Sequence, residues 1–170
     1  MSNIELIVLA RVVHVMAGVI WAGATFILAA VIAPMAARFG TEGAARLTGM
    51  VAGRVGHALG ISALLTVLSG SYLFATLHSK DGSASGFVLK VGAIAALLSL
   101  VIGFLIARPT GRKLARLSEQ QSLAAAPPAE MLQKMLGLRR RAVLSTRFTA
   151  ALLGLAVISM AGFRYAQALF

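Results

Sequence analysis

The stretch from Ile4 to Pro34, IELIVLARVVHVMAGVIWAGATFILAAVIAP, decides the fold. About 20 apolar residues at ~1.5 Å of rise each cross the ~30 Å hydrocarbon core of a bilayer, and this run is longer than that. Arg11, His14 and Trp21 interrupt it at spacings that place them near one face of a helix. Polar side chains inside lipid are costly, so they are candidates for function. The stretch therefore predicts a membrane-spanning helix that carries a candidate site.

The composition of the whole chain agrees with a membrane protein. Of its 170 residues, 59% are hydrophobic and 12% are charged, whereas soluble domains hold about a quarter charged residues. The absence of cysteine excludes disulfides, thiolate metal sites and cysteine nucleophiles. The net charge is +11, and the basic residues lie mostly in loops beside apolar segments. In that position basic residues set the topology and contact anionic lipid. We therefore expect no nucleic-acid partner.

Three further apolar segments complete an expected all-α fold, a polytopic membrane protein built as an antiparallel four-helix transmembrane bundle. The expected spans are residues 5–34, 56–77, 87–107 and 148–166, all in one domain. Residues 108–147 form a cytoplasmic loop that contains helical extensions of the third and fourth spans. The N-terminus lacks a basic region and a cleavage site, so we expect the first span to be retained rather than removed as a signal peptide.

The charges of the loops predict the orientation. The segment from Arg108 to Arg147 has nine basic and two acidic residues, and the segment from Arg38 to Arg54 nets +2, whereas the opposite side is nearly neutral. Because Lys and Arg stay on the cytoplasmic side, we expect a multi-pass protein of a bacterial inner membrane with both termini in the periplasm. The lipid bilayer is then its main partner.

Gly49, Gly53, Gly56 and Gly60 follow one another at intervals of four, three and four residues and so form a stripe on one face of the second helix. Small residues allow membrane helices to approach closely. The stripe therefore favours tight packing, either inside the bundle or in a homo-oligomer or larger membrane complex. The alternative is that a flat cofactor lies against it.

Approximate depths place Arg11, His14 and Lys90 together in the outer half of the bundle. The first and third spans both begin outside, and Lys90 lies about 5 Å inside the outer boundary, at three or four residues of ~1.5 Å. His14 is then the candidate metal ligand, an axial ligand of haem b, and Arg11 and Lys90 pair with the propionates. Gly18, one turn below His14, leaves room for a flat ring. A deprotonated Lys90 is an alternative second axial ligand.

Other interpretations of these residues stay open. His14 can instead hydrogen-bond a neighbouring helix, and Arg11 and Lys90 can simply reach the outer interface. Trp21 fits a packing or lumen-facing role better than a reactive one. His57 lies on the order of 10–20 Å deeper than His14, judged from helical rise, so the two histidines are not expected to share one haem.

Copper is the competing cofactor, because histidine and methionine both ligate it. Met16 is close to His14 in sequence, but residues two apart point to different sides of a helix. Met35 and Met50 lie near the cytoplasmic end and meet only across the first turn.

Three short motifs carry a family resemblance. His14 is followed by WAG at 21–23 and by Phe26, the second span ends in LSGSYLF at 68–74, and the third opens with GFVLK at 86–90. These motifs resemble those of the CopD-type copper-resistance membrane proteins and the HemJ-type protoporphyrinogen oxidases, which form a superfamily of four-helix membrane proteins. The resemblance covers most of the chain.

The two branches imply different functions. The HemJ-type branch implies haem b and oxidation of protoporphyrinogen, with His14 as the haem ligand and Lys90 close to the site. Its fourth span begins with an Arg…Asn-Glu pattern, whereas RRRAVLSTRFT here has Arg147 but no Asn-Glu pair, so oxidase activity stays open. The CopD-type branch implies copper movement across the inner membrane, and the basic third loop is closer to it.

From the residues and the resemblance together we expect a haem-b-binding membrane protein with a redox or electron-transfer role. One alternative is a CopD-like, copper-handling transport protein that uses His14. The other is a non-catalytic helical subunit that packs into a larger membrane complex through the glycine stripe.

Overall fold

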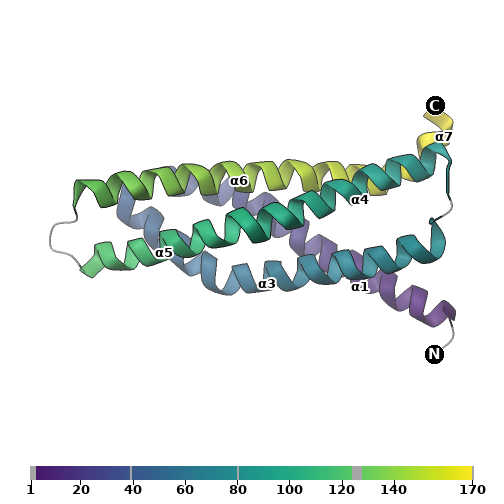
Figure 1. The fold of residues 1–170 in the computed structure, drawn as a ribbon, viewed down its shortest axis with the longest axis horizontal. Helices are drawn as coiled ribbons and strands as arrows, with labels where there is room; N and C mark the ends of the chain where they lie inside the picture. The colour runs from purple at the N-terminus through teal and green to yellow at the C-terminus, as the bar shows by residue number, and fades with distance from the viewer. Residues whose placement is uncertain (1–2, 39, 80, 124–127, 170) are drawn as a thin grey trace.

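The structure is a computed structural model that describes residues 3–38, 40–79, 81–123 and 128–169 as an antiparallel helical bundle (Figure 1). The first half of the chain forms one helical hairpin, made of α1 (Asn3–Ile27), the π-helical segment η1 (Leu28–Ile32), α2 (Ala33–Arg38) and α3 (Gly40–Leu77). The second half forms another, made of α4 (Ala84–Ile102), the π-helical segment η2 (Gly103–Ala107), α5 (Arg108–Leu123), α6 (Ala129–Gly162), η3 (Phe163–Tyr165) and α7 (Ala166–Leu169). The predicted all-α, four-helix bundle is confirmed, and the described residues contain no strand.

Among the described residues, four helical stretches are long and apolar enough to cross a membrane. They are Asn3–Ala36, Val55–Leu77, Ala84–Gln121 and Ala129–Tyr165. The chain is thus a multi-pass membrane protein, as its composition predicts. The third stretch runs into the segment expected as a loop because α5 continues α4 through η2 without a break.

The packing places small residues inside the bundle and large apolar residues outside it. Ala63, Ala95 and Ala156 are each only 3% exposed, whereas Val19 is 66% and Leu105 is 72% exposed. A soluble protein would bury the larger side chains. Small interior residues let membrane helices approach closely, and lipid covers the large outer ones. This distribution supports the membrane assignment independently of hydropathy.

The two hairpins meet around one core. Within each hairpin the long helices pack on each other, α1 on α3 and α4 on α6, and the hairpins join where α3 contacts α5 and α6 contacts α1. Trp21 is the largest member of the core cluster, which also contains Ala63, Ala95, Ala96, Leu153 and Ala156. The bundle is therefore held at its centre by one tryptophan among small residues.

Each hairpin contains the same backbone irregularity in its first helix. Proline has no N–H and clashes with the carbonyl four residues earlier, which interrupts regular α-helix. The residue before Pro34 donates its N–H to Leu28 O, and the residue before Pro109 donates to Gly103 O, so both turns close five residues back. At Pro34 the helix therefore continues through a π-helical turn, η1. Such turns are frequent at functional sites.

The two ends of the bundle differ in charge. We call the end where α1 begins and α6 finishes the terminal end, and the end that holds α2, α5 and the start of α6 the basic end (Figure 1). Exposed basic side chains gather at the basic end: Arg38, Arg112, Lys113, Arg116, Lys134, Arg140 and Arg141. This is the end that the sequence predicts to face the cytoplasm.

Candidate functional site

His14 ties α1 to α3. Its ring is half-buried, and Nδ1 lies 2.8 Å from the carbonyl oxygen of Thr66. A carbonyl only accepts, so Nδ1 donates. Nε2 of the neutral ring then carries the lone pair, the arrangement found in metal-ligating histidines whose other nitrogen donates to a backbone carbonyl. The interhelical hydrogen bond that the sequence left as an alternative is present, and it leaves a ligating atom.

Gly70 on α3 makes the position of the His14 ring possible. A Cβ at Gly70 would lie 2.7 Å from Cε1 and 2.9 Å from Nδ1 of His14. Real side chains do not approach this closely, so any larger residue would push the ring away from Thr66. Gly70 belongs to the motif at 68–74, but its role depends on the register between α1 and α3, which the sequence does not reveal.

The other residues predicted for this site have different surroundings. Arg11 is exposed, one helical turn from His14 toward the terminal end. Gly18 faces α3, since a Cβ there would lie 3.6 Å from Cγ2 of Thr66. Lys90 donates from Nζ to the carbonyl oxygen of Asp81 at 3.1 Å. The structure therefore groups His14 and Gly18 at Thr66 and gives Lys90 a separate partner.

Lys90 belongs to a capping arrangement at the start of α4. Ser83 is the N-cap residue, and its hydroxyl accepts from the Gly86 N–H at 3.2 Å. The Asp81 carboxylate accepts from the Ser83 N–H at 2.9 Å. Hydrogen bonds from Ser83, side chain and backbone, lower the pKa of Asp81, and the nearby charges of His78 and Lys90 add to this. The GFVLK motif thus has a structural role in holding this loop.

Gly86, the first residue of that motif, is required by the same arrangement. A Cβ at Gly86 would lie 2.6 Å from the carbonyl oxygen of Asp81, the atom that Lys90 also contacts. Glycine is therefore needed for the loop to close against the first turn of α4.

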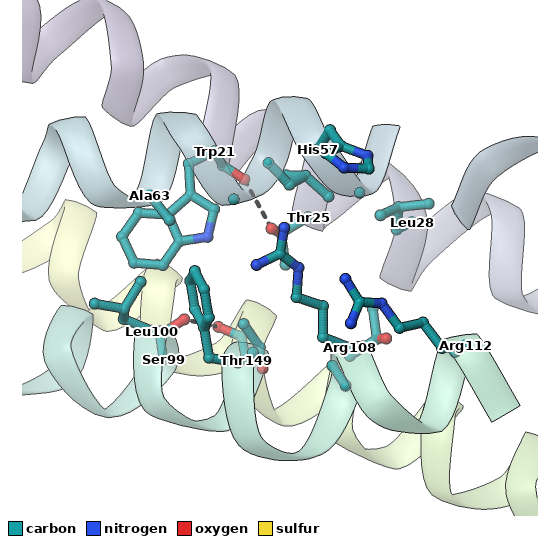
Figure 2. A pocket seen from close by; sticks show the side chains of 18 residues that line it. Trp21, Thr25, Leu28, His57, Ala63, Ser99, Leu100, Arg108, Arg112 and Thr149 are labelled. Carbon is teal, nitrogen blue, oxygen red and sulfur yellow. Dashed lines mark hydrogen bonds between the residues drawn. The ribbon is translucent and has the colours of Figure 1, made fainter. Parts of the chain in front are cut away.

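A cavity of about 220 Å³ lies between the two hairpins, toward the basic end. Figure 2 shows Trp21, Ala63 and Leu100 at one end of it and Arg112 at the other, with the Arg108 guanidinium between them. All four spans contribute to its wall, and so do both π-helical segments. It is distinct from the surroundings of His14, which does not line it.

Arg108 folds back into this cavity from the first turn of α5. Its Cζ lies 4.7 Å from the centroid of the Phe104 ring, a cation–π contact. Its Nη2 lies 3.1 Å from where a Cβ on Gly60 would be. Gly60 of the glycine stripe therefore makes room for a guanidinium. Gly56 also lines the cavity, and Gly49 and Gly53 lie outside the residues whose surroundings the structure describes.

Four residues with hydroxyl groups line the same cavity, and one of them, Thr146, donates from Oγ1 to the carbonyl oxygen of Ala142 at 2.9 Å. Thr25 donates from Oγ1 to the carbonyl oxygen of Trp21 at 2.7 Å, and Ser99 donates to the carbonyl oxygen of Thr149 at 3.5 Å. Thr149 is 7% exposed, and its Oγ1 is buried without a hydrogen-bond partner among the described residues. Buried hydroxyls normally have one. Oγ1 of Thr149 therefore remains available for a hydrogen bond to a ligand or a water molecule.

Arg108 and Thr149 are two residues of this cavity that were not predicted as candidates from the sequence. Arg108 was counted only as a loop charge that sets topology. Its position immediately before Pro109, at the end of an apolar span, is the signal that distinguishes it. Thr149 lies in an ordinary apolar helix, and no feature of the sequence shows that its hydroxyl lacks a partner. His57 and Trp21, both considered from the sequence, line this cavity rather than the surroundings of His14.

No protein-family model, curated protein or solved structure matches this chain. The resemblance to CopD-type and HemJ-type proteins therefore stays a prediction. The described residues also contain no group of three or more His, Asp or Glu side chains that could hold a metal ion. A haem on one histidine does not need such a group, whereas a copper site would have to recruit methionine.

Proposed function

We propose that this membrane protein binds haem b through His14 and has a redox or electron-transfer role. The observation that supports the proposal is the hydrogen bond from Nδ1 of His14 to the Thr66 carbonyl at 2.8 Å. It fixes the ring orientation and leaves the Nε2 lone pair for a metal, which is how ligating histidines are usually prepared. The donor chemistry of His14 therefore fits an axial ligand, in agreement with the family resemblance.

Other residues predicted for this site would then have defined roles in binding the haem. Arg11 is exposed and one turn away, so its guanidinium is available to a propionate. Lys90 uses one of its three ammonium protons on the Asp81 carbonyl, and two remain for a second propionate. Gly70 leaves the space that the His14 ring occupies. When bound, haem supplies one-electron chemistry whose potential its surroundings tune.

The test is the visible spectrum of the full chain, purified in mild detergent after expression with added haem precursor. We expect a Soret band that disappears in His14→Ala and persists in the matched control His78→Ala. His78 is a suitable control because it lies in the loop after α3, where its ring packs edge-on against Phe163 at 5.7 Å. The proposal is wrong if no band forms, or if the band survives His14→Ala unchanged.

Copper is the second candidate, because the same Nε2 lone pair suits a copper ion. Elemental analysis of the same preparations separates the two. Copper that is bound stoichiometrically without a Soret band and is lost in His14→Ala supports the copper-handling alternative. Equal copper in the wild-type protein and in His14→Ala excludes His14 as its ligand.

A further inference from the structure

We propose that the cavity between the two hairpins is a binding site for a small amphipathic anion, with its charged oxygens on Arg108 and its apolar part toward Trp21. This site is separate from His14, and the proposal does not depend on haem binding. The shared chemistry of the ligand is a carboxylate or phosphate group joined to a short apolar body.

The charge of the lining favours an anion. Arg108 and Arg112 both line the cavity, and none of the described residues that line it is acidic. Arg108 is half-buried, and its described contacts are the Phe104 ring face and the space left by Gly60. Removing a guanidinium from water without a counter-charge is costly. An oxyanion that meets the planar fork of arginine offsets this cost.

Polarity changes along the cavity from its mouth to its inner end. Arg112 and His57 lie toward the basic end, whereas Trp21, Ala63 and Leu100 form the inner end (Figure 2). Trp21 and Ala63 are only 5% and 3% exposed, so the inner end is buried and apolar. A ligand with one charged end and one apolar end matches this arrangement, and an inorganic ion alone would leave the apolar end unfilled.

The buried Thr149 hydroxyl adds a second point of recognition. Thr149 lines the cavity with a buried side chain, and its Oγ1 has no hydrogen-bond partner among the described residues. A buried hydroxyl in this state has lost its hydrogen bonds to water without gaining one in the protein, which is unfavourable. A ligand oxygen or a water brought in with the ligand would satisfy it, so ligand binding would remove an existing energetic defect.

The size of the cavity limits the apolar body. A cavity of ~150 Å³ holds benzene, so about 220 Å³ accommodates one substituted ring or a short acyl chain. Drug-sized ligands occupy ~300 Å³ or more.

Both π-helical segments border the cavity, from opposite hairpins. Leu28 comes from η1, and Gly103, Phe104 and Ala107 come from η2. π-Helical turns are frequent at functional sites, and the location of the cavity agrees with this tendency.

Trp21 makes the site directly observable, because it is the single tryptophan of the chain and lines the cavity. We would place the full-length protein in phosphatidylcholine nanodiscs and titrate it with hexanoate, its neutral analogue hexanamide, and inorganic phosphate. We expect hexanoate to change Trp21 emission and raise the midpoint of thermal unfolding. Hexanamide should bind at least about tenfold more weakly, since it lacks the charge that arginine recognises.

Variants assign the effect to named residues. Arg108→Gln should weaken hexanoate binding about tenfold or more, whereas Arg116→Gln, an exposed arginine on the same helix, should leave it unchanged. Thr149→Val removes the unpartnered hydroxyl with little change of shape. It should therefore raise thermal stability while it weakens binding. A purely structural hydroxyl, satisfied by water, would instead give lower stability and unchanged binding.

Nanodiscs with added phosphatidylglycerol identify the source of the anion. If the lipid itself shifts Trp21 emission in an Arg108-dependent way and displaces hexanoate, the bound anion is a lipid headgroup. If hexanoate binds equally in both nanodiscs, the ligand is a free solute. Equal binding of hexanoate and hexanamide, or anion binding that survives both Arg108→Gln and Thr149→Val, would overturn the proposal.

Discussion

The Nδ1 atom of His14 donates to the carbonyl oxygen of Thr66, 2.8 Å away, and so joins the first two spans near the terminal end of the bundle. The acceptor is a backbone atom, so no substitution of the Thr66 side chain removes it directly. The hydrogen bond depends instead on the register of α1 against α3. Gly70 lies under the ring and sets how closely the two helices approach there.

Gly70→Ala should therefore destabilise the protein. The added methyl would lie 2.7 Å from Cε1 of His14 and displace the ring from Thr66. We expect a loss of about 1–3 kcal/mol, as for other overpacked sites, together with weaker haem retention. The matched control is Gly56→Ala, where an added Cβ meets nothing within 4 Å and alanine raises helix propensity. Thermal unfolding in detergent measures the stability of both variants. Equal unfolding midpoints for Gly70→Ala and Gly56→Ala would contradict this interpretation.

The contact between Gly92 and Ser159 should be equally sensitive in the second hairpin. A Cβ at Gly92 would lie 2.8 Å from Cβ of Ser159 and 3.3 Å from the carbonyl oxygen of Ala156. Gly92→Leu should separate α4 from α6 and give a poorly folded protein, seen as early elution or aggregation in size-exclusion chromatography. Gly23→Leu is the control, because Gly23 has open space around its Cβ position. A normal elution profile for Gly92→Leu would show that the helices can move apart without loss of the fold.

The loop before α4 should lose stability in acid. Hydrogen bonds from Ser83 lower the pKa of Asp81 below its ordinary value of 3.8. A lowered pKa in the folded state means that the ionised carboxylate stabilises the fold above the ordinary value, and that this contribution disappears as pH falls through the folded-state value. The unfolding midpoint of the wild-type protein should exceed that of Asp81→Asn at neutral pH and converge with it in acid. A difference that is constant with pH would contradict the assignment.

The charge asymmetry of the bundle predicts its orientation. The basic end should face the cytoplasm, because Lys and Arg near span ends resist translocation. A reporter active only in the periplasm should therefore be active when fused after Phe170 and inactive when inserted after Leu123. The reverse pattern would show that the bundle has the opposite orientation in the membrane, with the mouth of the Arg108 cavity facing the periplasm.

The fold was predictable because it depends on properties that each segment carries alone. Run length and hydropathy are sufficient to predict the spans. The sites were less predictable, because depth in the membrane does not specify which helices are neighbours. Depth alone predicts that Lys90 is level with His14, whereas the packing of α1 on α3 and of α4 on α6, and the hydrogen bond from Lys90 to the Asp81 carbonyl, are seen only in the structure.

Arg108 shows a second limit of sequence reasoning. An arginine at the end of a span has the same sequence signature whether it stays in solvent or folds back into the bundle. The difference arises from the π-helical turn before Pro109 and from Gly60 on another helix. The space expected beside Gly18 is similarly decided by a distant residue, because Thr66 lies against it.

The central claim is that the chain has two separate sites, a haem ligand at His14 and an anion cavity at Arg108. The most direct test is the visible absorption spectrum of three preparations of equal concentration: wild type, His14→Ala and Arg108→Gln. The account predicts a Soret band in the wild-type protein and in Arg108→Gln, and none in His14→Ala. A band that persists in His14→Ala and disappears in Arg108→Gln would place the haem in the cavity and contradict the account.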